Sequence, residues 1–152
     1  MNEHKIKFIH KRGVEMDKKN ELLAAAREVF AEKGYKAAGI SDIAKKSQMA
    51  VGSFYKYYES KEAIFLEVYV AENSHIREGI MQRVDWQGEP EAIVEQLFAV
   101  TFELISPNKI LAEWNKLGIS QILHDYYNQD AGRASNAFHQ FLIQTFSQRL
   151  QE

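Results

Sequence analysis

Apolar residues recur every three or four positions along most of the chain, which is the spacing of one face of an α-helix. The first stripe predicts a helix over residues 18–33, with Asp17 as its N-cap. Its apolar positions are Leu22, Ala26, Val29 and Phe30. Gly34 follows as a C-terminal cap in the left-handed region, which glycine reaches without steric cost.

The next two apolar segments are short and close together. They predict one helix over residues 40–47, opened by Gly39, and another over residues 51–57. A helix-turn-helix needs a small residue where its two helices meet, and Ala44 supplies it. Gln48 stands at the turn position where a positive φ is expected, at a cost of about 1 to 2 kcal/mol for a residue other than glycine. The spacing predicts a helix-turn-helix over Ile40–Tyr57.

The remainder of the chain repeats the helical spacing in four longer segments and contains no alternating strand pattern. The predicted helices cover residues 60–84, 93–106, 110–126 and 134–150. We therefore expect an all-α fold of about seven helices, in which a three-helix DNA-binding domain is continuous with a C-terminal helical bundle. The expected parts are a basic arm (1–16), the helix-turn-helix domain (17–60) and a body (61–152).

Charge is divided unevenly between the two halves of the chain. The net charge is −2, but residues 1–61 hold 13 Lys and Arg against 8 Asp and Glu, whereas residues 62–152 hold 6 against 13. Residues 1–61, called the head below, are therefore basic, which suits a protein that presents one face to phosphates. A chance distribution is the alternative. The basic arm residues either add phosphate or minor-groove contacts or form an unstructured tail; they are Lys5, Lys7, Lys11 and Arg12.

The chain lacks the residues needed for several kinds of metal site and catalytic site. The chain has no cysteine, and its five histidines lack the spacing of a helical metal-ligand pair. There is no glycine-rich phosphate loop and no nucleophile elbow. We expect neither an enzyme nor a cofactor or metal. No apolar run has the length of a signal peptide or a membrane span, so we expect a soluble, cytoplasmic protein with no membrane partner.

The second helix of the predicted motif has side chains suited to DNA. Its first residues, 51–53, are small and allow a close approach to bases and backbone. Tyr55 and Lys56 can reach phosphates, and Lys61, one turn into the following helix, can hold the flanking backbone. The alternative is that the aromatic residues around Tyr55 are a packed cluster of a helical protein, which we expect for Phe54 and Tyr58.

Residues 17–69 resemble the N-terminal domain of the TetR/AcrR family of regulators. The resemblance rests on residues 40–44 (ISDIA), 51–55 (VGSFY) and 57–58 (YY), followed by 60–62 (SKE), and on Phe30, Gly34 and Tyr35. It implies an all-helical homodimer that binds a palindromic double-stranded DNA operator, usually as a repressor. The residues expected to line the DNA lie in the helix-turn-helix and at the start of the following helix. They are Ser41, Val51, Gly52, Ser53, Tyr55, Lys56, Tyr57 and Lys61. Residues 47–50 (SQMA) depart from the family's usual Ala-Gly-Val-Ser turn.

The resemblance also implies that a small-molecule effector enters the body and releases the operator. Aromatic and polar residues of the body are candidate lining residues, although core packing explains them as well. They are Phe98, Phe102, Trp114, His124, Tyr126 and Tyr127. Family members commonly continue through two further helices that form the dimer interface, whereas this chain stops at Glu152. It is therefore either a fragment or a short variant that dimerises by another surface, such as the face of Phe138, Phe141 and Phe146.

These features together predict a transcriptional regulator, a repressor that binds a pseudo-palindromic operator as a dimer and is released by a small molecule. The alternative is a helical small-molecule-binding or protein-interaction module that does not bind DNA sequence-specifically.

Overall fold

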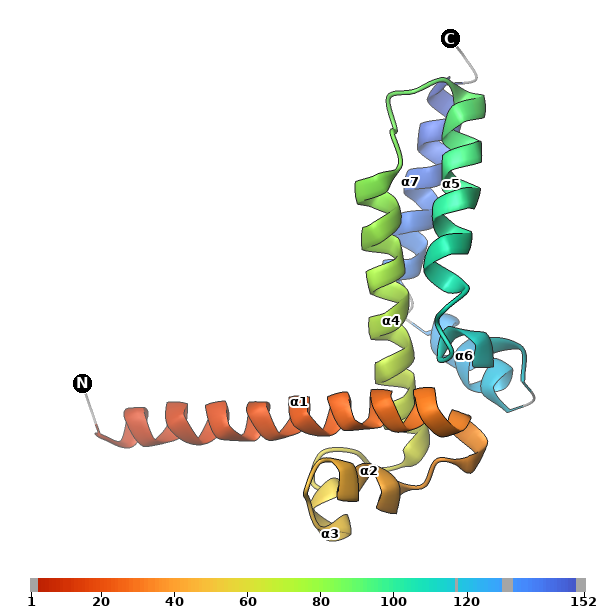
Figure 1. The fold of residues 1–152 in the computed structure, drawn as a ribbon. Coiled ribbons are helices and arrows are strands. Elements are labelled where there is room, and N and C mark those ends of the chain that lie inside the picture. Colours follow the sequence, from red (N-terminus) through yellow and green to blue (C-terminus); the bar gives the residue numbers. More distant parts are fainter. Residues whose placement is uncertain (1–2, 117, 130–132, 150–152) are drawn as a thin grey trace. The chain divides into compact units, whose positions relative to one another are not determined.

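The computed structural model describes residues 3–116, 118–129 and 133–149, and the side chains of residues 14–114, 116, 118–129 and 137–148. The basic side chains of the predicted arm lie outside this set. All described elements are helices, so the predicted all-α class is confirmed (Figure 1). The chain forms two compact units, Met1–Val68 and Tyr69–Glu152. Among the described residues, no helix combines the length and the apolar character needed to cross a bilayer.

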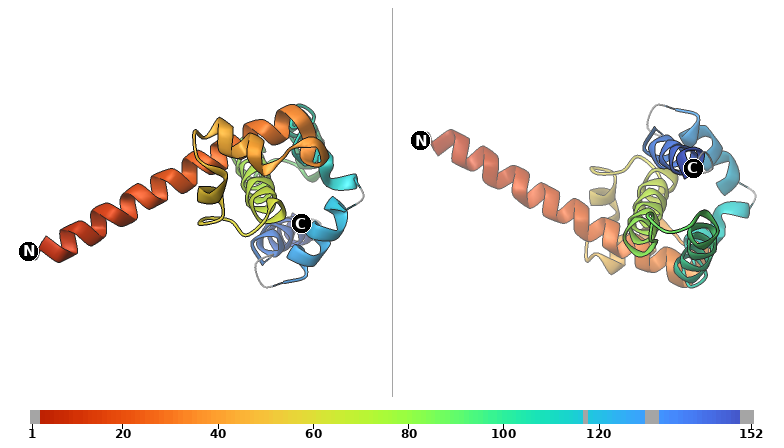
Figure 2. Two further views of the ribbon diagram at one scale, coloured as in Figure 1. Left: turned by 90° about the horizontal axis from the view of Figure 1, so that it is seen from below. Right: turned by 90° about the horizontal axis from the view of Figure 1, so that it is seen from above.

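Unit 1 contains α1 (Glu3–Ala37), α2 (Ile40–Lys46), α3 (Val51–Phe54) and the first turns of α4 (Lys61–Arg83). The three helices expected within residues 17–60 correspond to α1, α2 and α3. The first half of α1 extends well beyond α2 and α3 in every view (Figures 1 and 2).

The prediction that Asp17 caps the first helix is wrong. The helix begins at Glu3 and passes through Asp17 without interruption. An aspartate caps a helix only where the preceding chain leaves the helical conformation. Here the preceding residues contain no proline and include several good helix formers, so the helix continues.

Gly34 ends the regular part of α1. Its backbone has φ 75° and ψ 164°, so the positive φ expected at this position is confirmed. This combination is accessible almost only to glycine. The amide of Ala38 then donates to the Gly34 carbonyl at 3.1 Å, which closes one more turn before α2 begins.

The core of unit 1 consists of the predicted apolar stripe of α1 and residues from each of the other helices. The ring of Phe30 meets that of Phe65 edge to face, with centroids 5.1 Å apart, and the ring of Tyr35 lies 4.8 Å from the same Phe65. Leu22, Ile43 and Phe54 are each completely buried. The ring contacts hold the start of α4 on α1, and buried side chains of α2 and α3 complete the core.

The third helix is shorter than predicted. It ends at Phe54, and residues 55–57 form a turn in place of the expected helix over 51–57. The amides of Lys56 and Tyr57 donate to carbonyls three residues earlier, at 3.2 and 2.9 Å. This tighter winding is common at helix ends. It turns the chain toward α4, whose first turn is capped by the Ser60 hydroxyl oxygen, an acceptor for the Ala63 amide at 3.1 Å.

Unit 2 contains the rest of α4 together with α5 (Pro90–Ile105), η1 (Leu111–Asn115), α6 (Ile119–Tyr127) and α7 (Arg133–Arg149). Helices α4, α5 and α7 run side by side (Figures 1 and 2). The predicted single helix over 110–126 is wrong, because Gly118 has φ 91° and separates the 3₁₀ helix η1 from α6.

The connection from α5 to η1 is held by a buried polar contact. The Asn108 side-chain amide donates to the Glu72 carboxylate at 2.5 Å, and its oxygen accepts from the amides of Ile110 and Leu111 at 3.1 and 3.0 Å. Glu72 is 6% exposed, and its carboxylate therefore depends on such partners.

We predict that Gly34→Ala lowers the free energy of unfolding by about 1 to 2 kcal/mol, because a Cβ is strained at this φ and ψ. Urea denaturation followed by circular dichroism measures the loss. Gly52→Ala is the matched control, since no atom lies within 4 Å of the Cβ that it adds in α3, and it should have little effect. Equal stabilities for the Gly34 variant and the wild type would contradict the assignment.

Candidate nucleic-acid interface

The turn between α2 and α3 has the geometry that a helix-turn-helix requires. Ala44 is 1% exposed where the two helices meet, and its carbonyl accepts from the Met49 amide at 2.8 Å and from the Ser47 hydroxyl at 3.1 Å. Gln48 has φ 56°, which confirms the predicted left-handed residue. The turn is thus closed by hydrogen bonds that compensate for the backbone cost at Gln48.

The entry to α2 is fixed by an aspartate whose role the sequence analysis missed. Asp42 accepts from the Gly39 amide at 3.0 Å, one half of a capping box, and its other oxygen lies 2.8 Å from the Lys33 ammonium. The Lys33 contact, with the Gly39 hydrogen bond, lowers the pKa of this carboxyl. The signal in the sequence was the acidic residue three positions after Gly39. Ser41, between them in the first turn of α2, is exposed.

Helix α2 is also tied to α1 by a lysine. The Lys46 ammonium lies 2.7 Å from the Glu28 carboxylate and 3.2 Å from that of Glu32. Both contacts raise the pKa of Lys46. These pairs are largely exposed, so they orient α2 more than they stabilise the fold.

Helix α3 presents one face to solvent. Phe54 is buried, whereas Val51 and Tyr55 are 45% and 56% exposed. A Cβ added at Gly52 would meet no atom within 4 Å, and Ser53 is half-buried. Lys56 is exposed and Tyr57 half-buried in the turn that follows. The structure therefore brings the predicted residues from 51 to 57 together on α3 and its following turn.

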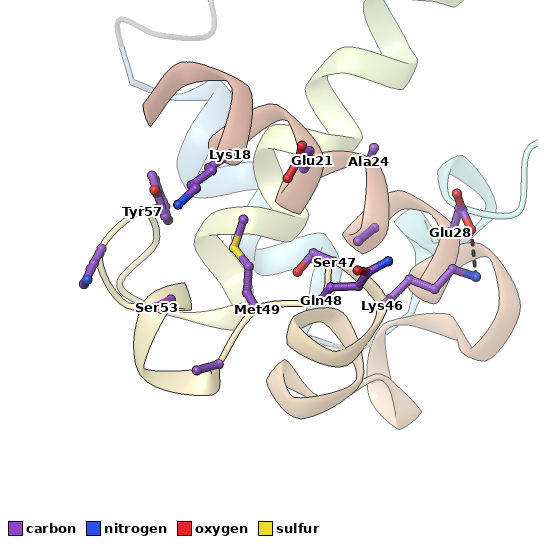
Figure 3. A pocket seen from close by; sticks show the side chains of 13 residues that line it. Lys18, Glu21, Ala24, Glu28, Lys46, Ser47, Gln48, Met49, Ser53 and Tyr57 are labelled. Atoms are coloured by element: carbon purple, nitrogen blue, oxygen red, sulfur yellow. Dashed lines mark ion pairs between the residues drawn. The ribbon is translucent and has the colours of Figure 1, made fainter. Parts of the chain in front are cut away.

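A hollow of about 740 Å³ lies between α1 and this motif (Figure 3). Ser53, Lys56 and Tyr57 line one side, together with Gln48 and Met49 of the turn. The other side is the face of α1 that carries Lys18, Glu21, Ala24, Ala25 and Glu28. Lys18 and Lys46 line the hollow as well, although neither was predicted to lie at the motif. The spacing of Lys18, Glu21, Ala25 and Glu28 on one helical face was the signal available.

Lys61 differs from the other predicted contact residues, because its ammonium binds the protein's own backbone. It donates to the carbonyl oxygens of Tyr35 and Ala38 at 2.9 and 3.0 Å, and it lies 4.4 Å from the centroid of the Tyr35 ring. Carbonyls at the end of a helix lack internal partners, and a lysine satisfies them well. At most one N–H of Lys61 remains for a phosphate.

Tyr35 completes this junction between α1 and α4. Its hydroxyl donates to the Glu62 carboxylate at 2.7 Å. Burial, with Glu62 beside it, raises the pKa of Tyr35, and the same hydrogen bond lowers the pKa of Glu62. Residues 61 and 62 therefore fasten the start of α4 to the end of α1.

Residues 22–68 match the family model of bacterial regulatory proteins, tetR family. The N-terminal domain of the chain is therefore similar to that of the TetR family. Among relatives, the HTH-type transcriptional regulator YvdT of Bacillus subtilis is 36% identical over 94 residues, which are 60% of this chain and 47% of YvdT. The chain thus spans about half the length of this relative.

Solved structures of TetR regulators share the fold of the chain. The match to one from Shewanella sp. PV-4 covers 86% of this chain and 69% of that protein's chain, with a TM-score of 0.66 and 19% sequence identity. Another is the transcriptional regulator FadR from Bacillus subtilis, solved in complex with stearoyl-CoA. This match covers 71% of this chain and 64% of the FadR chain, with a TM-score of 0.52 and 26% sequence identity.

Of the six residues predicted to line an effector pocket, four are exposed and two are half-buried. Phe98, Phe102 and Trp114 are 72%, 76% and 60% exposed, and His124 is exposed as well. Tyr126 and Tyr127 are half-buried with their rings in edge contact, and the Tyr127 hydroxyl accepts from the Asn73 amide at 2.8 Å. The sequence pattern identified apolar positions of the C-terminal body but not which of them are covered.

We predict that Gln48→Gly raises the free energy of unfolding by up to about 1 kcal/mol. Glycine removes the left-handed strain of about 1 to 2 kcal/mol from the folded state. Part of this gain is lost because glycine also gives the unfolded chain more conformational freedom. Urea denaturation of the variant and the wild type provides the comparison. A destabilised variant would show that the Gln48 side chain stabilises this turn by more than its left-handed backbone destabilises it.

Lys61→Met tests the capping role separately from any DNA contact. Without DNA, we expect a loss of about 1 to 2 kcal/mol of unfolding free energy, because two helix-end carbonyls lose a charged donor. Lys36→Met, at an exposed lysine in the last turn of α1, is the matched control and should change stability little. If the two variants were equally stable, Lys61 would have no structural role.

Proposed function

We propose that the chain is a DNA-binding transcriptional regulator, a repressor that binds a pseudo-palindromic operator as a homodimer and is released by a small molecule. The observation that carries this proposal is the exposed face of α3, held on a helix-turn-helix of the TetR family. The YvdT relative, itself an HTH-type transcriptional regulator, supports the same class.

The side chains of α3 suit a close approach to the major groove. Val51 and Gly52 are small and exposed, and a Cβ at Gly52 would meet nothing within 4 Å. Base edges are therefore accessible to the Ser53 hydroxyl and to the Val51 methyl groups. Tyr55 and Lys56, exposed in the turn that follows, are placed to contact phosphates and set the register.

The charge of the head favours the same partner. Residues 1–61 carry a net charge of +5. Several lysines of this part are paired with carboxylates of the protein, among them Lys33 and Lys46. Lys18 and Lys56 line opposite sides of the hollow beside α3, where a DNA backbone would bring phosphates. Ser41, Tyr57 and Lys61 remain predicted contacts.

The proposed effector would act on unit 2. A groove of about 350 Å³ is lined by residues of α4 and by one aromatic residue of α7, Phe138. In it Arg77, whose guanidinium donates to the Ser74 hydroxyl at 3.0 Å, lies beside the apolar Met81. Glu78 also lines the groove, so a small molecule there would meet a guanidinium and a carboxylate beside apolar side chains. The FadR neighbour was solved in complex with stearoyl-CoA.

The DNA partner can be identified by selecting bound duplexes from a random pool. We expect an enriched site with two related half-sites, since a dimer of helix-turn-helix proteins reads two major grooves one helical turn apart. Failure to enrich any sequence would favour the alternative, a helical ligand-binding or interaction module that does not read DNA.

Replacing both Tyr55 and Lys56 by alanine should weaken binding to the enriched duplex by at least about tenfold in fluorescence anisotropy, with a shallower dependence on salt. Lys36→Ala removes an equal charge from exposed α1 surface and should leave affinity nearly unchanged. Unaltered affinity in the double variant would show that this face does not contact the DNA.

A further inference from the structure

A buried tyrosine hydroxyl lies directly after the turn of residues 55–57. Tyr58 is 5% exposed, and among the described residues its hydroxyl oxygen has no hydrogen-bond partner. The centroid of its ring lies 5.9 Å from that of the buried Phe54, so the ring is part of the core of unit 1. A buried hydroxyl without a hydrogen bond destabilises the fold, and nearly all such groups in native structures have a partner.

The carboxylate beside this hydroxyl, that of Glu67 in α4, is already bound by a lysine of α1. The Lys19 ammonium donates to both oxygens of Glu67, each at 3.0 Å. The same ammonium lies 5.1 Å from the centroid of the Tyr58 ring. Burial raises the pKa of Tyr58, and the negative charge of Glu67 raises it further, as expected for a carboxylate near the hydroxyl. Two donors therefore compete for one carboxylate.

The two donors differ in how easily they can leave Glu67. The side chain of Lys19 is 37% exposed and that of Glu67 is 42% exposed. Ion pairs this exposed contribute little net stability, because water screens them. The ammonium of a lysine also sits on a flexible four-carbon stem, so it can turn away while the backbone stays in place. The ring of Tyr58, in contrast, is confined by the core.

Lys19 lies at the edge of the surface that we propose to contact phosphates. The preceding residue, Lys18, lines the hollow beside α3 together with Lys56 and Tyr57. The ring next to the Lys19 ammonium belongs to Tyr58, which directly follows Tyr57. A DNA backbone at this turn would attract the ammonium, since a lysine that binds a phosphate releases counterions from the DNA.

We propose that Lys19 is a further phosphate contact, and that Tyr58 replaces it on Glu67 when DNA binds. The Lys19 ammonium turns from the carboxylate to a phosphate, and the Tyr58 hydroxyl donates a hydrogen bond to the vacated oxygen. The buried hydroxyl thereby gains a partner, and Glu67 keeps a donor. The phosphate contact rests on the proposed function, whereas the exchange of donors can be tested without DNA.

A double-mutant cycle on Lys19 and Tyr58 tests the exchange in the free protein. In the wild type, Tyr58→Phe should leave the equilibrium constant of unfolding unchanged or lower it, because the hydroxyl that it removes has no partner. In the Lys19→Met background the hydroxyl donates to Glu67, so the same change should raise this constant about tenfold. Urea denaturation of the four proteins measures both effects. Equal effects of Tyr58→Phe in the two backgrounds would overturn the exchange.

The phosphate contact is tested with a duplex selected from a random pool. Lys19→Met should weaken binding about tenfold and lower the slope of log affinity against log salt by about one. The double variant Lys19→Met and Glu67→Gln should bind as weakly, although it removes one charge of each sign. Lys36→Met, at an exposed lysine of α1, is the matched control and should keep the wild-type affinity and slope. Wild-type affinity in the double variant would overturn the contact, because it would assign the loss to the unpaired charge of Glu67.

Tyr58→Phe provides an independent readout, because it removes no charge and its ring is buried away from the DNA. It should nevertheless weaken binding at least about threefold, since Glu67 then lacks a donor once Lys19 has left. Wild-type affinity in this variant would overturn the replacement by Tyr58 while DNA binding by α3 stands. If the wild type bound no duplex, the proposed function and the phosphate contact would both be overturned, and the cycle in urea would still decide the exchange.

Discussion

The backbone conformation of Gln48 is the constraint on which the orientation of α3 depends. A left-handed residue at this position lets the chain reverse within the few residues between α2 and α3, and the Met49 amide then reaches the Ala44 carbonyl. A larger side chain than that of Ala44 would force the helices apart. With the turn closed, Phe54 is buried, and the exposed face of α3 follows from the helical geometry.

Around this turn, electrostatic contacts fix α2 and α4. The same contacts pair several lysines of the head with groups of the protein itself. Asp42 binds Lys33 and caps α2, and Lys46 binds two carboxylates of α1. Lys61 satisfies carbonyls at the end of α1. A charge count along the sequence treats all these groups alike. In the structure, three lysines line the hollow beside α3, and one of them, Lys46, is held by carboxylates of α1, whereas Lys18 and Lys56 are the other two.

The sequence predicted the parts that depend on local geometry and spacing. The positive φ of Gly34 and Gln48 and the buried stripe of α1 followed from turn chemistry and helical periodicity. It could not predict where α1 begins, because Asp17 is compatible with either a cap or a helix interior. Tertiary contacts decided the rest. The same periodic pattern describes Ile93, which is buried, and Phe98, which is exposed, and only the packing of neighbouring helices distinguishes them. The Lys61 contacts join residues 23 and 26 positions apart and were likewise beyond local reasoning.

If the exposed face of α3 and its following turn read DNA, a bound duplex should shield their amides from solvent. Amide hydrogen exchange of the chain, measured with and without a duplex enriched from a random pool, tests it most directly. We expect the amide hydrogens of residues 47–57 to exchange more slowly when the duplex is added, while those of α5 are less affected. Unchanged exchange over residues 47–57, with protection elsewhere in the chain, would contradict it.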